Sequence, residues 1–175
     1  YTVSTDEELK NALEQIKTSS SNEASIILNA DVGAPTENYI ASFGVEGKHI
    51  IVSSTEGNMY SLSLSNLGIL NGSCTFENVD VRGYKLYCTG YKTIFTNQGE
   101  IHLTGTLYGG GYKTTVASTY VVIDANGYIN PSSSSGLHDV IGGSYQGSVE
   151  GNTYLEITGN IQMQGGNHLN PGCVM

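Results

Sequence analysis

The stretch GGGYKTTVASTYVVIDANG at residues 109–127 is followed by a second copy, GGSYQGSVEGNTYLEITGN, at residues 142–160. Both copies contain Gly-Gly-x-Tyr, then Thr-Tyr-(Val/Leu)-x-Ile, and both end in a turn that contains Asn. Repetition of this kind is typical of folds that stack one structural unit on the next. The matched residues are Tyr112 with Tyr145 at an offset of 33, and Tyr120, Ile123 and Asn126 with Tyr154, Ile157 and Asn160 at an offset of 34.

A third Gly-Gly pair begins at Gly165, 23 residues after Gly142, which indicates a coil of about 23 residues. On this interpretation the first copy is lengthened by the insertion NPSSSSGLHD at residues 130–139, which is polar and has loop composition. Coils of this length, with short strands and with Gly and Asn at the corners, form a β-solenoid around a stack of Val, Ile, Leu and Phe. We therefore predict an all-β solenoid.

Short strand-like runs recur along the chain before and within these copies. Gly and Tyr are abundant, at 23 and 12 residues, and only 3 residues are Pro, a composition that favours many short strands joined by tight turns. The run at residues 74–81, CTFENVDV, has no purely apolar face, so we expect a bulge or bend within it. The expected strands cover residues 49–54, 59–65, 74–81, 92–96, 100–105, 119–127 and 153–159.

The N-terminal segment STDEELKNALEQIK predicts a single amphipathic helix over residues 6–17. Thr5 and Glu8 have the spacing of a capping box, and an apolar stripe follows on one helical face. A lone helix must bury such a stripe against the end of the β region. We therefore divide the chain into a helical cap with the first strand, residues 1–33, and β-helix coils over residues 34–175.

The charge of the chain limits its partners. The formal net charge is -9 and the isoelectric point is near 4.7, which argues against binding to nucleic acid phosphates. No apolar run approaches the roughly 18 to 20 residues that span a bilayer, so we expect no membrane insertion.

Two stretches resemble known families. The N-terminal segment, YTVSTDEELKNALEQIKTSSSNEASIILNADV, resembles the capping segment of right-handed parallel β-helix proteins. The segment IGGSYQGSVEGNTYLEITGNI is similar to the glycine repeats of adhesin-like surface proteins of anaerobic gut and rumen bacteria, whose β-helix is related to pectate-lyase-like folds. The resemblance implies a secreted or cell-wall-attached, multi-modular parent that binds glycans or host and plant surfaces.

The residues give little support for catalysis. Pectate-lyase-like enzymes need a calcium-binding carboxylate cluster and a cationic base, and Arg82 is the only arginine in the chain. Asp80 would share a strand face with Arg82, which could mimic half of such a site, but a surface ion pair beside a turn is the favoured explanation. The remaining carboxylates and the four His residues show no catalytic or metal-binding spacing. The three Cys residues have no CxxC spacing; Cys74 and Cys88 fit buried free thiols, although a disulfide between them stays open.

The tripeptide GYK occurs three times and supplies the candidate ligand-binding surface. Tyr rings stack on the C–H faces of sugars while Lys binds hydroxyl groups, and the last two copies lie 21 residues apart, so Tyr91 and Tyr112 would stack on adjacent rungs. The alternative is that these residues form solenoid corners, where Gly has conformational freedom and Lys protects exposed β surface. The candidate residues are Tyr84, Lys85, Tyr91, Lys92, Tyr108, Tyr112 and Lys113.

We therefore expect a non-catalytic extracellular adhesin or carbohydrate-binding module. Its partners would be a polysaccharide or a host or plant surface glycan and other modules of the same parent chain, from which this chain would be an excised piece. Two alternatives stay open: a lyase or hydrolase that acts on acidic glycans, and a structural stalk. We expect no cofactor, with calcium left open.

Overall fold

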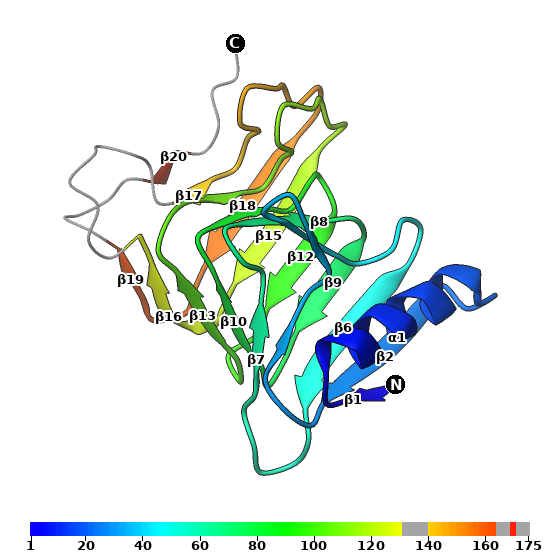
Figure 1. Ribbon diagram of the computed structural model, residues 1–175. Coiled ribbons are helices and arrows are strands. Elements are labelled where there is room, and N and C mark those ends of the chain that lie inside the picture. Colours follow the sequence, from blue (N-terminus) through cyan, green and yellow to red (C-terminus); the bar gives the residue numbers. More distant parts are fainter. Residues whose placement is uncertain (131–139, 164–168, 171–175) are drawn as a thin grey trace.

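The computed structural model describes residues 1–130, 140–163 and 169–170, and it consists of three sheets and one helix (Figure 1). In order, sheet A holds β1 (Thr2–Val3), β2 (Glu23–Leu28), β6 (His49–Ser54), β9 (Ser73–Phe76), β12 (Lys92–Phe95), β15 (Thr119–Ile123) and β18 (Thr153–Ile157). Sheet B holds β19 (Ile161–Met163), β16 (Asn126–Ile129), β13 (Glu100–Leu103), β10 (Asp80–Gly83), β7 (Ser61–Ser63) and β3 (Val32–Gly33). Sheet C holds β20 (Leu169–Asn170), β17 (Val140–Ile141), β14 (Leu107–Tyr108), β11 (Lys85–Tyr87), β8 (Leu67–Leu70), β5 (Ile40–Phe43) and β4 (Thr36–Glu37).

The chain visits the three sheets in turn. It passes from β9 in sheet A to β10 in sheet B and β11 in sheet C, and then repeats the circuit one layer further on with β12, β13 and β14. Each of these strands pairs in parallel with the corresponding strands of the neighbouring circuits. The all-β fold with stacked parallel strands fits a β-helix-like solenoid, in which the N- and C-terminal segments lie towards opposite ends (Figure 1).

The interior is formed by alternate residues of the strands. Ile50 and Val52 of β6 are buried, while their neighbours in the strand are only partly so. Phe43, Phe76 and Phe95 come from different coils and stack inside the solenoid, with ring centroids 6.0 Å apart for the first pair and 5.0 Å for the second. Stacking one coil on another therefore repeats the same apolar layer, as the predicted interior requires.

The N-terminal helix, α1, covers Asp6–Thr18 and confirms the helix predicted at residues 6–17. The Thr5 side chain accepts a hydrogen bond from the Glu8 amide at 3.2 Å, and the Glu8 carboxylate accepts one from the Ser4 amide. The predicted apolar stripe is buried: Leu9, Ala12, Leu13 and Ile16. Within the part of the chain that the structure describes, no helix is long and apolar enough to cross a membrane.

The predicted strands are present, but two of them are divided. The run at residues 74–81 forms the end of β9 and the start of β10, which lie in different sheets, so the expected bend is a corner of the solenoid. The run at residues 119–127 is likewise divided between β15 and β16. A corner lets the apolar side chains on both sides of it point inwards, which one straight strand could not achieve.

The two repeat copies lie on neighbouring coils in the predicted register. Tyr120 pairs with Tyr154, and an isolated bridge joins Tyr112 to Tyr145. The coils vary in length around the expected 23 residues: His49 pairs with Ser73, 24 positions later, and Cys74 pairs with Thr93, 19 positions later. The two copies stack at an offset of 34, as expected for a lengthened first copy. Loops of different length at the corners change the coil length without disturbing the strands. Of the insertion at residues 130–139, all but Asn130 lies outside the described residues.

Candidate functional site

The predicted GYK residues separate into two groups. Tyr84 and Lys85 lie at the start of β11, and Tyr108 in β14 and Tyr112 follow on the next coil. Lys92 opens β12 in sheet A, with Tyr91 directly before it. The prediction that Tyr91 stacks on Tyr112 is wrong: Tyr112 pairs with Tyr145, because the chain between β14 and β15 makes a longer excursion than the sequence spacing suggested.

Two tyrosines of the first group, Tyr108 and Tyr112, each stack on a tyrosine that was not among the predicted residues. Tyr87 and Tyr108 are buried and lie face to face, with centroids 4.8 Å apart. Tyr112 and Tyr145 stack at 5.6 Å, with their planes within 3° of parallel. The Lys113 ammonium lies 5.1 Å from the Tyr112 centroid. The ring faces are thus largely used within the protein, which gives these residues a structural role whether or not they also contact a ligand.

The second group is a ladder on the outer face of sheet A. Lys92, Tyr120 and Tyr154 are in register on consecutive strands. The two rings stack with centroids 4.5 Å apart, and the Lys92 ammonium lies 5.4 Å from the Tyr120 centroid. The pairing of the two tyrosines that the repeat offset predicts is confirmed, and both residues are exposed, at 39% and 43%.

A different cluster, with more varied chemistry, lies on the outer face of sheet B. The inward residues of β10, β13 and β16 fill the core, so the alternate residues point outwards. Arg82, His102 and Tyr128 are in register across these strands. They line a shallow hollow of about 430 Å³ together with Gly83 and Thr104, which we call the Arg82 hollow.

Asp80 holds two of the residues that line the Arg82 hollow, Arg82 and His102. Its side chain is only 4% exposed. One carboxylate oxygen accepts a hydrogen bond from Arg82 Nε at 2.5 Å, and the other lies 2.7 Å from His102 Nδ1. Burying a carboxylate is costly unless charged or polar partners satisfy it, and these two partners do so. The hydrogen bond that Arg82 donates to Asp80, and the negative charge of Asp80, raise the pKa of Arg82 above its ordinary value.

The remaining functional groups of the hollow face solvent. The Arg82 side chain is 59% exposed, and the bond from Nε is the only side-chain hydrogen bond that it makes among the described residues, so its terminal amino groups are left to donate to water or a ligand. The His102 ring lies 4.7 Å from the Tyr128 ring. Glu100, which is 43% exposed, has an oxygen 3.9 Å from His102 Nε2. The arrangement offers hydrogen-bond donors, acceptors and an aromatic surface in one place.

Asp80, Glu100 and His102 also have oxygen and nitrogen atoms close enough together to hold a metal ion. Arg82 already occupies one oxygen of Asp80, and a guanidinium beside a cation is unfavourable. The sequence joined only Asp80 and Arg82 as a pair. It left Glu100 and His102 without a catalytic or metal-binding partner and did not single out Tyr128, because these residues come from later coils and no local motif joins them.

The thiols of Cys74 and Cys88 are free and buried. Burial raises the pKa of Cys88 to about 12 and raises that of Cys74 as well, so both thiols are inert core groups. Cys173 lies outside the described residues.

Comparison with known proteins adds no family: no family model matches the chain, and no curated protein or solved structure shows significant similarity to it. By its fold, the chain belongs to the all-β class of proteins, with parallel strands stacked in three sheets.

Proposed function

We propose that the chain is a non-catalytic, extracellular adhesin-like module of a multi-modular bacterial surface protein, and that it binds a neutral glycan in the Arg82 hollow. In this proposal the fold is a right-handed parallel β-helix of the pectate-lyase-like kind, and α1 caps its N-terminal end. The surrounding modules of the parent protein attach it to the cell surface.

The observation that carries the proposal is the way Asp80 holds Arg82. Because Nε is fixed by a buried carboxylate, the exposed guanidinium is oriented before any ligand arrives, and less conformational entropy is lost on binding. Tyr128 lies in register two strands away and supplies an aromatic surface for the C–H face of a sugar. Glu100 and His102 supply acceptors and donors for hydroxyl groups.

The charge of the hollow selects a neutral sugar. The negative charge of Asp80 already balances the positive charge of Arg82 at 2.5 Å, and Glu100 adds a further negative charge. The chain as a whole carries -9. A uronic acid would therefore meet a neutral or negative surface. The hydroxyl groups of a neutral sugar can instead accept a hydrogen bond from Arg82 and donate one to Glu100.

A second candidate function is a polysaccharide lyase or hydrolase that acts on acidic glycans. One observation favours it: the hollow brings the carboxylate Glu100 beside a cation, Arg82, and an imidazole, His102. Against it stands Asp80, whose two oxygens are already used and which is buried away from any substrate. Incubation with uronic acid polymers, followed by measurement of new reducing or unsaturated ends, distinguishes enzyme from binding module.

The binding proposal is tested by affinity electrophoresis of the protein in gels that contain soluble β-glucan, xylan, mannan or polygalacturonate. We expect retardation by at least one neutral polymer, and a loss of affinity of tenfold or more in Arg82→Gln. Lys92→Gln is the matched control, because it removes the same charge from the outer face of sheet A. Equal weakening by both variants would show a non-specific charge effect, and the absence of binding to every polymer would favour a structural stalk.

A further inference from the structure

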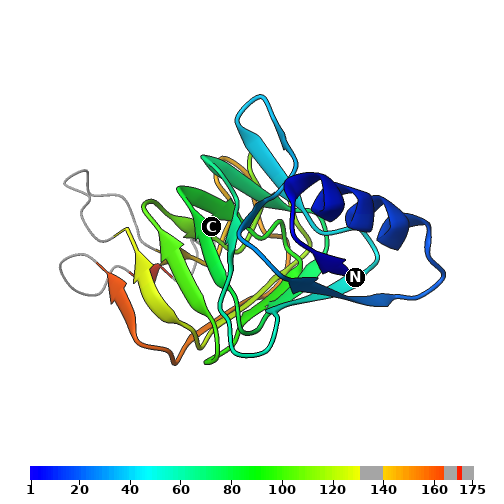
Figure 2. The same ribbon diagram turned by 60° about the horizontal axis from the view of Figure 1, so that its bottom comes forward.

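A β-hairpin near the N-terminal end carries an unusual turn. Within the described residues, β4 and β5 form the only antiparallel pair, and the hairpin projects from the solenoid above α1 (the light-blue hairpin in Figure 2). Its two tip residues, Asn38 and Tyr39, both have positive φ angles, of 49° and 68°. Turns of this kind favour Asn-Gly, because the second position disfavours a side chain. Tyr at this position is therefore unfavourable for folding.

Within the segments that the structure describes, the Tyr39 ring makes no contact that would offset this unfavourable backbone conformation. Its side chain is the most exposed of the large hydrophobic residues in the described part of the chain, at 78%. No ring contact, hydrogen bond or cation contact to it is present among the described residues, whereas Tyr120 and Tyr154 stack together. A strained residue with an uncovered aromatic face points to a role outside the fold.

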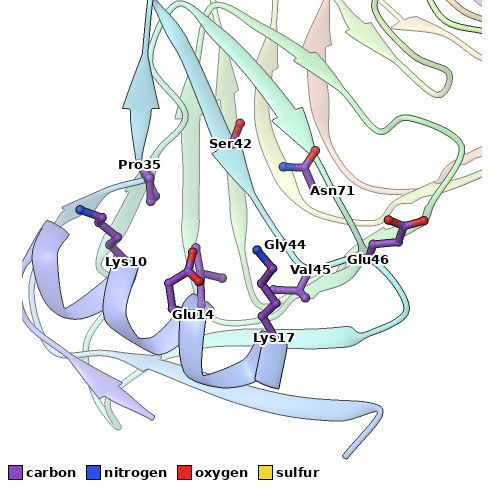
Figure 3. Close-up of a pocket in the computed structure, with 10 residues that line it drawn as sticks. Lys10, Glu14, Lys17, Pro35, Ser42, Gly44, Val45, Glu46 and Asn71 are labelled. Carbon is purple, nitrogen blue, oxygen red and sulfur yellow. The ribbon is translucent and has the colours of Figure 1, made fainter. Parts of the chain in front are cut away.

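The base of the same hairpin forms one wall of a groove of about 290 Å³. Leu13 and Val45 contribute apolar surface to it. Figure 3 shows Lys10, Glu14 and Lys17 on the side of α1, with Ser42, Asn71 and Glu46 on the side of the coils. Because strands rise about 3.3 Å per residue, Tyr39 lies roughly 10 Å from the hairpin base at Pro35 and Ser42.

The lining of the groove indicates the chemistry of its ligand. Two lysines, Lys10 and Lys17, are balanced by two glutamates, Glu14 and Glu46, and Ser42 and Asn71 add a neutral hydroxyl and an amide. A groove without net charge that offers many hydrogen-bonding groups over an apolar floor suits a chain of neutral sugars. We propose that the groove and Tyr39 together form a second glycan-binding surface, which takes an extended neutral oligosaccharide and stacks one of its rings on Tyr39.

The hairpin fits a glycan better than other partners. The residues next to Tyr39, Thr36, Glu37 and Asn38, are exposed and polar, so they provide no ring of apolar contacts such as a protein hot spot has. The hairpin has no Lys or Arg and carries Glu37, which opposes binding to an anionic lipid surface. A sugar needs only one aromatic face with polar groups beside it.

The test uses the whole chain, labelled with ¹⁵N and titrated with cello-, xylo-, manno- and malto-oligosaccharides. We expect one series to shift the amide signals of residues 36–46 and of the second half of α1. Tyr39→Gly should weaken this binding tenfold or more while the protein stays folded, because glycine suits the turn. Tyr39→Phe should keep it, and Tyr154→Ala, which removes an exposed ring on sheet A, should leave it unchanged.

The two proposed binding surfaces can be disproved independently of each other. Wild-type affinity in Tyr39→Gly, or sugar-induced shifts confined to β10, β13 and β16, would overturn the hairpin surface and leave the Arg82 hollow. If Tyr39→Gly weakens oligosaccharide binding and Arg82→Gln has no effect, the hairpin surface stands and the Arg82 hollow is overturned. If no neutral oligosaccharide shifts any signal, both proposals are wrong.

Discussion

His102 of β13 is held by Asp80 of the neighbouring strand β10, with Nδ1 2.7 Å from a carboxylate oxygen. Since the carboxylate can only accept, Nδ1 carries the proton and Nε2 faces Glu100. The same Asp80 fixes the guanidinium of Arg82, so one buried carboxylate orients the exposed Arg82 and the partly buried His102, which come from neighbouring coils.

Asp80→Asn is expected to lower the free energy of unfolding by about 1–3 kcal/mol, because it weakens two charge-assisted hydrogen bonds at a buried position. Urea denaturation measures the change. Glu100→Gln is the control; its side chain is exposed and should alter stability by no more than about 0.5 kcal/mol. If the two variants lose the same stability, Asp80 does not organise the site.

The stacked pair of Tyr120 and Tyr154 should contribute a coupling free energy of about 0.5–1.5 kcal/mol between neighbouring coils. A double-mutant cycle with Tyr120→Ala, Tyr154→Ala and the double variant measures it by denaturation. Strictly additive losses would show that the rings lie together without stabilising each other.

Phe76→Ala should destabilise the protein by about 3–5 kcal/mol, because Phe76 lies between Phe43 and Phe95 and its loss leaves a cavity in the middle of the stack. Met59→Ala, at an exposed position, serves as control and should have little effect. A small loss for Phe76→Ala would mean that the coils can collapse into the space.

Stability should fall at alkaline pH because of Tyr87 and Tyr108. Burial raises the pKa of both phenols in the folded state, so the unfolded chain loses protons first, above about pH 10. The stability that these groups contribute is thus fully present below pH 10 and is lost as the pH rises towards the folded pKa. Denaturation at pH 9 and pH 11 should show a smaller loss in Tyr87→Phe than in wild type. An equal loss would exclude Tyr87 as a cause.

Local patterns in the sequence predicted much of the fold. The capping box at Thr5 and Glu8 and the apolar stripe after it define α1 to within a residue at its end. The offset between the repeats placed Tyr120 opposite Tyr154. Both signals are local or strictly repeated, so the residues that form the contact can be recognised without knowledge of the rest of the chain.

The Arg82 hollow could not be predicted in this way. Arg82, His102 and Tyr128 meet only because β10, β13 and β16 stack in register, and the loops between them differ in length. The 21-residue spacing of the last two GYK copies suggested a contact between Tyr91 and Tyr112, but Tyr112 pairs with Tyr145 instead.

The sequence by itself determined that this protein has one amphipathic helix followed by stacked strands with an apolar interior, because periodicity and composition act along the chain. Only the tertiary structure decided which outward side chains share a surface. That depends on the number of residues between one strand and the next, and the loops at the corners vary this number without any change in the pattern of the strands themselves.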